Sequence, residues 1–412
     1  MVIIDIRPST DPPEAKFNAN IVIALPGTSV TFKDNTKGLP TSWNWQFPGA
    51  TPDNSNSQHP SGIVYNTPGF YDVCLIAANS YGSDTMNQKT YIYIVDTSNN
   101  FITGTMPLKN SIGVERDSNI RIQFKQAMEP SSFSNTSIRI FGDLRGSYSF
   151  QSTYNSATNT LVINPDNLFM TGENIVIVLT EKIHTSQNDS IVPYSFTFQV
   201  TSGHGTGIFK QVAYFPISCN EWPGSLKCGD YDNDGDIDIA TSRGDLLLND
   251  GSGNFSITSH GLWGYAIANG DFDMNHMVDI FNGSTIALNE GGGLFAYQGV
   301  GTWGTNLNTS DLNNDGLMDI IGSLPWPYVQ NGSVLTTKRN IGNVNFIEYS
   351  SHTTSDIINS TALGDIDNDG DFDICAAGGS VFINTLDTLN MMTSLKFSGS
   401  IIKSGDFNND GN

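Results

Sequence analysis

Acidic side chains crowd into short, glycine-containing segments of this sequence. Residues 229–239 read GDYDNDGDIDI, which places five aspartates within nine positions, from Asp230 to Asp238. Two like charges about 4 Å apart repel each other by about 4 kcal/mol at an effective dielectric constant near 20. A positive charge should therefore lie among these carboxylates, or the segment should be unstructured.

The acidic segment is one copy of a repeating unit. The leading aspartates of five copies lie at positions 230, 271, 311, 365 and 406, which are 41, 40, 54 and 41 residues apart. A second motif, with Asn, Gly and Phe in constant order, accompanies three of them at residues 246–255, 286–295 and 338–346. Repeats of about 40 residues that are built from strands predict the blades of a β-propeller.

The pattern D-x-D-x-D-G-x-x-D suits a cation that takes oxygen ligands. In a tight loop, side chains at positions 1, 3 and 5 can converge, glycine at position 6 permits a sharp turn, and the last aspartate closes the shell. Ca²⁺ takes about six to eight oxygen ligands, whereas Mg²⁺ demands stricter octahedral geometry. The pattern therefore predicts Ca²⁺ as the cofactor. The alternative is a solvated acidic turn that binds no metal.

The flanking residues distinguish these loops from helical calcium motifs. Loop one is followed by IATSRGDLLLN (239–249), a strand–turn–strand pattern, and the glutamate at the twelfth position of an EF-hand is missing. Residues 202–412 resemble instead FG-GAP/VCBS repeats, the calcium-loop blades of integrin α-subunit propellers and of many bacterial surface proteins. Related propellers close with about seven blades, so the resemblance implies an incomplete propeller here.

The resemblance assigns metal ligands to the three loops that keep the full pattern, with a backbone carbonyl from the seventh position of each. They are Asp230, Asp232, Asp234, Asp238 and the carbonyl of Asp236 in loop one; Asp311, Asn313, Asp315, Asp319 and the carbonyl of Leu317 in loop three; and Asp365, Asp367, Asp369, Asp373 and the carbonyl of Asp371 in loop four.

Two further copies depart from the pattern. Loop two keeps Asp271, Asp273, Asn275 and Asp279, but His276 replaces the glycine. A left-handed backbone at this histidine would cost about 1 kcal/mol, so we expect a weak or empty site. The fifth copy retains only three candidate ligands and is also expected to be weak. They are Asp406, Asn408 and Asp410.

Tryptophan stands eight residues before the leading aspartate in three repeats, at Trp222, Trp263 and Trp303. Eight residues correspond to about one strand, so these side chains are expected at the blade end opposite the metal loops, near the central channel. Their aromatic faces could stack on a sugar or clasp a cationic side chain. Packing between blades is the alternative interpretation.

Two domains precede the repeats, after an N-terminal extension of residues 1–14. Residues 15–96 contain alternating strands, and SWNWQFPGATP (42–52) with YNTPGFYDVCLIAANSYGSDT (65–85) resembles an Ig-like PKD domain of Bacteroidetes-type surface proteins. In residues 97–201, DSNIRIQF, AMEP and YSFTFQV resemble the bacterial Ig-like domain of surface and adhesive proteins. The resemblances imply β-sandwich spacers or stalk modules.

The net charge, the lengths of the apolar runs and the motifs that are missing argue against several classes of function. The chain has 41 acidic and 19 basic residues, a net charge of −22, whereas nucleic-acid binding requires a basic surface. No apolar run approaches the roughly 20 residues of a membrane span, and no HExxH, GxSxG or phosphate-loop motif is present. Cys219 and Cys228 could form a disulfide across a short loop, or remain free thiols.

The sequence thus predicts an all-β chain of two Ig-like sandwiches followed by an incomplete propeller. We expect an extracellular or cell-surface, calcium-binding, non-enzymatic protein that serves adhesion or ligand binding, with a glycan or a cell-surface or matrix protein as partner. The alternative is a set of accessory modules from a secreted polysaccharide-degrading enzyme or peptidase. The chain ends inside a metal loop and shows no signal-peptide pattern, so we expect a fragment.

Overall fold

The computed structural model describes residues 12–94, 101–202, 225–301, 304–325, 332–355, 357–386, 388–392 and 401–404. Strands dominate these residues, and the only helix among them is a 3-10 turn, Pro130–Ser132. None of their helices has the length and apolarity needed to cross a membrane. The all-β prediction is therefore confirmed. The chain divides into two compact units, Met1–Asn99 with Met391–Ser394, and the remainder.

Residues 12–94 form the first sandwich. Its sheets have the strand orders β2-β10-β9-β5-β7, β3-β8-β6 and β1-β4. Alternate residues of β9 face the core, which also contains the fully buried Trp45. The strands are β1 (Phe17–Ala19), β2 (Ile23–Ala24), β3 (Ser29–Val30), β4 (Phe32–Asp34), β5 (Ser42–Gln46), β6 (Ala50–Thr51), β7 (Asn54–Ser55), β8 (Ile63–Tyr65), β9 (Gly69–Asn79) and β10 (Gly82–Ile94).

Residues 101–202 form the second sandwich. Two sheets, with the orders β11-β13-β17-β16 and β12-β19-β18-β14-β15, enclose a core of isoleucine and phenylalanine side chains. The strands are β11 (Ile102–Met106), β12 (Ser111–Val114), β13 (Ile120–Phe124), β14 (Ile138–Gly142), β15 (Gly146–Ser147), β16 (Phe150–Asn155), β17 (Thr160–Pro165), β18 (Asn174–Leu179) and β19 (Tyr194–Val200).

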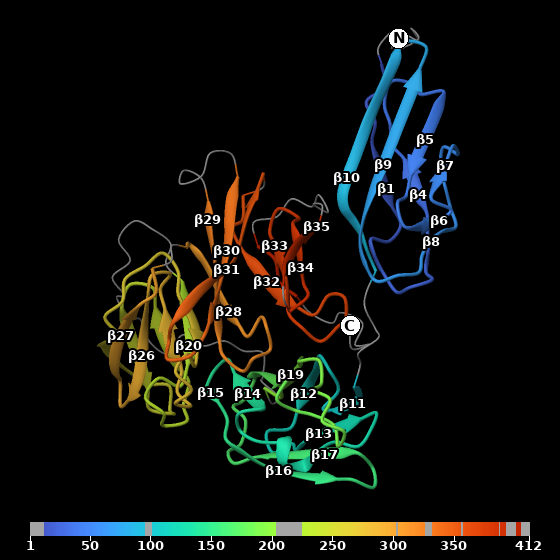
Figure 1. The fold of residues 1–412 in the computed structure, drawn as a ribbon. Coiled ribbons are helices and arrows are strands. Elements are labelled where there is room, and N and C mark those ends of the chain that lie inside the picture. Colours follow the sequence, from blue (N-terminus) through green and yellow to red (C-terminus); the bar gives the residue numbers. More distant parts are fainter. Residues whose placement is uncertain are drawn as a thin grey trace. The chain divides into compact units, whose positions relative to one another are not determined.

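Residues 225–392 form the repeat region, in which four blades follow one another in chain order (Figure 1, yellow to red). Each blade is a four-stranded antiparallel sheet whose strands pair in sequence order. The blades are β20 (Leu226–Gly229), β21 (Asp238–Thr241), β22 (Asp245–Asn249) and β23 (Phe255–Ser259); β24 (Ala268–Gly270), β25 (Asp279–Phe281), β26 (Thr285–Gly291) and β27 (Leu294–Gly299); β28 (Asn306–Ser310), β29 (Asp319–Pro325), β30 (Ser333–Asn340) and β31 (Phe346–Thr354); and β32 (Thr361–Gly364), β33 (Asp373–Ala376), β34 (Val381–Asn384) and β35 (Leu389–Met392).

The burial of the inner strands of the blades explains why the repeats stack. Every residue of β34 is buried, and so is every residue of β25. Apolar residues dominate strands whose two faces are covered, and the polar residues of these two strands, Asp279 and Asn384, are hydrogen-bonded. Each blade therefore needs neighbours on both sides to exclude water.

A buried asparagine joins each of the last three blades to the one before it. The Nδ2 atom of Asn289, which is fully buried in the second blade, donates to the Tyr231 carbonyl of the first blade at 2.8 Å. Asn340 donates in the same way to Phe272, and Asn384 to Leu312. The acceptor is always the second residue of the preceding acidic loop. The regular asparagine of the second sequence motif is thus a clamp between blades.

Replacing this clamp should destabilise the repeat region. Asn289→Ala removes donors from the Tyr231 and Val278 carbonyls and the acceptor of the Gly291 N–H. Because buried polar groups without partners are costly, we expect the free energy of unfolding to fall by about 2–4 kcal/mol. Urea denaturation in the presence of a chelator measures this. Asn254→Ala, at an exposed asparagine, is the control, and equal losses in both variants would contradict the clamp.

Candidate metal centres

The four acidic loops occupy the same place in the four blades. Each loop joins the first strand to the second, and its last aspartate is the first residue of the second strand. These last aspartates are Asp238, Asp279, Asp319 and Asp373, and each is completely buried. All the loops therefore lie at the same end of their blades.

The last aspartate of each loop holds three segments of its blade together. In loop one, the Tyr231 N–H donates to Asp238 Oδ2 at 2.8 Å, and the Asn249 N–H donates to Asp238 Oδ1 at 2.8 Å. The equivalent six bonds in the other three loops measure 2.7 to 2.9 Å. Sequence reasoning assigned these residues only a ligand role. The structure adds a structural role, because they fix the start of the loop and the third strand.

The first aspartate of each loop closes the turn from within. Its Oδ2 atom accepts the N–H of the sixth residue, from Gly235 to Asp230 at 3.1 Å and from Gly370 to Asp365 at 2.9 Å. Loops two and three repeat this bond. The turn therefore orients the carboxylate toward the centre of the loop before any ligand is present.

Two positions in each loop have a left-handed backbone. The sixth position has φ of 96° at Gly235, 91° at Gly316 and 97° at Gly370, as the sequence pattern predicts. His276 also adopts a positive φ, of 70°. Sequence reasoning missed the fourth position, which is left-handed in all four loops, at Asn233, Met274, Asn314 and Asn368. Asparagine tolerates this conformation better than most residues, so the recurring asparagine was the available signal.

Three of the loops bring carboxylates together. One oxygen from each member lies within 4.8 Å of the others in the clusters Asp230–Asp232–Asp234, Asp271–Asp273–Asp279 and Asp365–Asp367–Asp373. Among the described residues, loop three forms no such cluster of three carboxylates. In loop three, Asn313 Nδ2 donates to Asp315 Oδ2 at 2.8 Å. The weak candidates Asp406, Asn408 and Asp410 lie outside the described residues.

Loop two converges despite its histidine. Ser147 of the second sandwich donates to Asp271 Oδ2, and its hydroxyl lies 2.7 Å from His276 Nδ1. The histidine that replaces the glycine therefore takes part in a contact that glycine could not make. The expectation that loop two binds metal weakly stays a prediction.

Buried oxygen atoms without partners show that loops one, three and four fit a cation. Asp230 Oδ1, Asn313 Oδ1, Asp367 Oδ2 and Asp371 Oδ1 are all buried and accept no hydrogen bond. Leaving such a group unsatisfied costs about 1–3 kcal/mol, and more when it is charged. A cation that takes oxygen ligands would satisfy them. The side chain of Asp371 was not expected here, since the pattern assigned only its carbonyl.

Burial and mutual repulsion shift the acidity of the loops. Burial, together with the charges of Asp232 and Asp230, raises the pKa of Asp238 to about 6. Burial, together with repulsion from Asp369 and Asp365, raises the pKa of Asp367 to about 8. The metal-free loops therefore retain protons near neutral pH, which a bound cation would displace.

Trp263, in the segment between β23 and β24, lies against the first blade at the end opposite its acidic loop. A β-carbon at Gly244, in the turn between β21 and β22, would lie 3.0 Å from Trp263 Nε1. The residue is 69% exposed, and its two interpretations, ligand binding and packing between blades, stay predictions. Trp222, Trp303 and Cys219 lie outside the described residues. Cys228 is a free thiol in the structure, which favours the free-thiol alternative over a disulfide.

The pKa shifts predict a pH-dependent stability that calcium should reverse. The pKa values of Asp238, Asp367 and Asp369 are raised above 3.8 in the folded chain, to about 6, 8 and 6. The stability that these three groups contribute to the metal-free chain is thus fully present below about pH 4 and is lost as the pH rises through about 6 to 8. We expect the melting temperature in a chelator to fall between about pH 5 and 8, and saturating Ca²⁺ to offset that fall.

Two Asp→Asn substitutions test this prediction, one inside an acidic loop and one, the control, outside the loops. Asp367→Asn should flatten the metal-free pH profile, because its amide does not ionise. Asp250→Asn, at an exposed residue outside the loops, should leave the profile unchanged. A metal-free profile that is flat in the unmodified chain would contradict the assigned shifts.

Three regions of the chain match known families. Residues 10–94 match the PKD domain, residues 96–200 the bacterial Ig-like domain, and residues 311–376 the FG-GAP-like repeat. The comparison with curated proteins gave no match.

Two solved structures illustrate the distant likeness to known folds. CopC from Methylosinus trichosporium OB3b is 13% identical, covers 26% of this chain and 96% of its own, and has a TM-score of 0.20. A quinonprotein alcohol dehydrogenase-like protein from Bacteroides thetaiotaomicron VPI-5482 is 11% identical over 90% of this chain and 92% of its own, with a TM-score of 0.23. Scores this low carry no functional argument. The family matches show that the chain combines a PKD domain, a bacterial Ig-like domain and FG-GAP-like repeats.

Proposed function

We propose that this protein is an extracellular, non-enzymatic binding or adhesion protein whose repeat region is stabilised by Ca²⁺. The observation that carries the proposal is the convergence of carboxylates around buried oxygens that have no hydrogen-bond partner. The Ig-like and FG-GAP modules indicate an extracellular, β-rich module protein, and none of the matched domains is a catalytic one. Millimolar calcium is an extracellular condition, which agrees with this class.

The chain's own residues would hold the ion in loops one and four. Asp230, Asp232 and Asp234 would bind it in loop one, and Asp365, Asp367 and Asp373 in loop four. Bound Ca²⁺ would supply positive charge that offsets the repulsion among these carboxylates. The last aspartates would continue to accept N–H bonds through their remaining lone pairs. The loops would thus stabilise the blades while leaving no ligand position for catalysis.

The ligand of the protein is proposed to be a glycan or a cell-surface or matrix protein. Trp263 and Tyr265 present two aromatic side chains that are 69% and 57% exposed, in the segment between β23 and β24. An exposed aromatic face can stack on a sugar ring or a cationic side chain. Trp222 and Trp303 are proposed to contribute at the equivalent places in their repeats.

Calcium should stabilise the chain against unfolding. At a free Ca²⁺ concentration about 100-fold above its dissociation constant, one site adds about 2.7 kcal/mol. We expect the melting temperature to rise with Ca²⁺, to fall on chelation, and to rise less with Mg²⁺. Differential scanning calorimetry measures this. Asp367→Asn should reduce the rise and Asp250→Asn should preserve it. A melting temperature unaffected by Ca²⁺ would exclude the metal-cage proposal.

Removing the exposed tryptophan should weaken ligand binding without destabilising the fold. Trp263→Ala deletes a largely exposed side chain, so we expect a change of less than about 0.5 kcal/mol in unfolding free energy. Retention on immobilised polysaccharides, a concrete glycan probe, should fall by about tenfold or more. Tyr81→Ala, at an exposed aromatic residue of the PKD domain, is the control. A loss of stability with retention unchanged would assign Trp263 to packing.

A further inference from the structure

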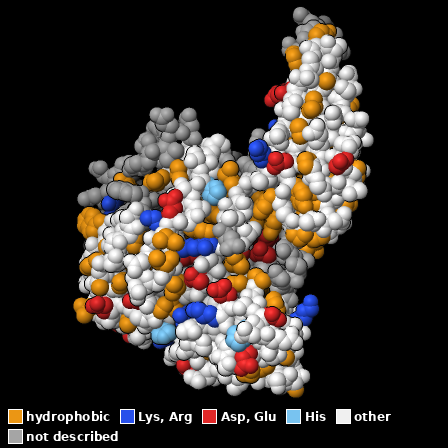
Figure 2. Space-filling view, viewed as in Figure 1, with side chains coloured by type: hydrophobic (Ala, Val, Ile, Leu, Met, Phe, Trp, Pro, Cys, Tyr) orange, Lys and Arg blue, Asp and Glu red, His pale blue; other side chains and the backbone are white. Residues whose placement is uncertain are grey.

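The bacterial Ig-like domain contacts the metal loops of the repeats. At loop one, the Asp230 N–H donates to the Leu144 carbonyl at 2.7 Å. At loop three, Arg139 packs so closely that a β-carbon on Gly316 would lie 3.0 Å from its Cγ. Figure 2 shows acidic and basic side chains next to one another in the area between strands β14–β15 and the repeats. This domain is therefore more than the stalk module predicted from the sequence.

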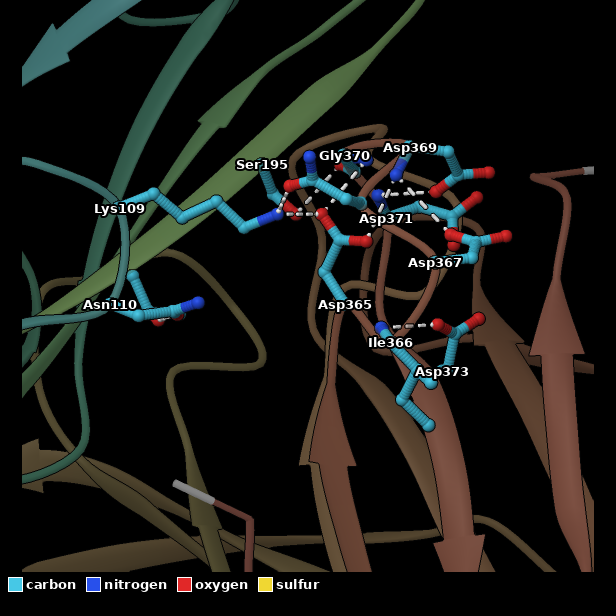
Figure 3. A network of polar contacts seen from close by, with 12 residues as sticks. Lys109, Asn110, Ser195, Asp365, Ile366, Asp367, Asp369, Gly370, Asp371 and Asp373 are labelled. Carbon is cyan, nitrogen blue, oxygen red and sulfur yellow. Dashed lines mark hydrogen bonds and ion pairs between the residues drawn. The ribbon is translucent and has the colours of Figure 1, made fainter. Parts of the chain in front are cut away.

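Loop four receives the strongest of these contacts. The Lys109 ammonium, in the turn between β11 and β12, pairs with Asp365 Oδ2 and donates to Asn368 Oδ1 at 2.6 Å (Figure 3). The Ser195 N–H donates to the Gly370 carbonyl at 2.6 Å. The Lys109 side chain is 12% exposed and that of Asp365 is 6% exposed. The ion pair is thus largely shielded from solvent. Salt screens such a buried pair less than it screens an exposed one.

Loop four carries more negative charge than one calcium ion neutralises. Its five carboxylates belong to Asp365, Asp367, Asp369, Asp371 and Asp373. One Ca²⁺ would leave three negative charges, and Lys109 lies against the first of these residues. Figure 3 shows Lys109 approaching from the Ig-like domain, whereas the other aspartates extend from the repeat. Lys109 and a metal ion bound by the carboxylate cluster would therefore both interact with Asp365.

An independent observation indicates that this loop fits a ligand. Asp367 is 6% exposed and Asp371 is 2% exposed, and each has a buried oxygen without a partner. Lys109 bonds to neither of them. The ammonium thus pairs with Asp365 Oδ2. The unpartnered oxygens of Asp367 and Asp371 remain available to another cation.

We propose that Lys109 is a built-in competitor of calcium at loop four, so that metal binding there and the contact between the Ig-like domain and the repeats are negatively coupled. The proposal rests on the proposed calcium binding. The Lys109 ammonium beside Asp365 repels an incoming Ca²⁺. It also partly neutralises the Asp365 carboxylate, which is one of the proposed calcium ligands. By reciprocity, bound Ca²⁺ weakens the Lys109–Asp365 pair by the same factor. The affinity of this metal site is therefore set by a residue from another domain.

Calcium titration of the full chain tests this coupling. Lys109→Met removes the ammonium and keeps the aliphatic stem, so we expect one Ca²⁺ site to bind about tenfold more tightly. The gain should shrink when the ionic strength is raised about tenfold, because salt screens the repulsion. Lys109→Arg should retain the original affinity. Lys182→Met, at an exposed lysine of the same domain, should change nothing.

A double-mutant cycle assigns the effect to loop four. In an Asp367→Asn background, which impairs that site alone, the gain from Lys109→Met should vanish. Hydrogen exchange supplies a second measurement, since Ca²⁺ should speed exchange around residues 107–111 in the unmodified chain and not in Lys109→Met.

Each outcome of these experiments is decisive. Equal or weaker calcium affinity in Lys109→Met would overturn the competition, and weaker affinity would make Lys109 a positioning residue for Asp365. Persistence of the gain in the Asp367→Asn background would move the effect to another loop and also overturn the proposal. If neither the unmodified chain nor Lys109→Met took up calcium, the proposed function itself would fail. Equal binding in both would leave that function intact and remove only the coupling.

Discussion

Buried negative charge at one end of every blade is the constraint on which the repeat region depends. The last aspartate of each loop is completely buried, and its two oxygens accept two backbone N–H bonds. These bonds fix the loop against the second and third strands, but they do not remove the charge. Further carboxylates converge on the same point. The fold thus gathers like charges that repel each other unless protons or a cation accompany them.

The same loops also connect the larger parts of the second compact unit. The carbonyl of the second loop residue accepts the asparagine of the next blade, as Tyr231 does from Asn289. From the other side, Ser147 and Lys109 of the Ig-like domain reach the first aspartates of loops two and four. Each of these loops therefore contacts both another blade and the adjoining domain.

Much of this arrangement could be predicted from the sequence, because it depends on local patterns. The period of about 40 residues and the glycine at the sixth loop position specified strands joined by tight turns, and Gly235 and Gly370 have the expected left-handed backbone. Alternating apolar residues predicted the two sandwiches. The carboxylates of Asp365, Asp367 and Asp373 were expected to converge and do so. The recurring asparagines, such as Asn289 and Asn368, were visible, but their roles were not.

The sequence by itself determined which residues form strands, turns and acidic loops, because those choices depend on neighbours along the chain. Only the tertiary structure decided what lies against each loop. Lys109 is 256 residues from Asp365, and Ser147 is 124 residues from Asp271. No spacing rule relates such distant residues, since their contact follows from how a sandwich and a set of blades pack. The charge that balances loop four therefore comes partly from another domain, which local patterns do not reveal.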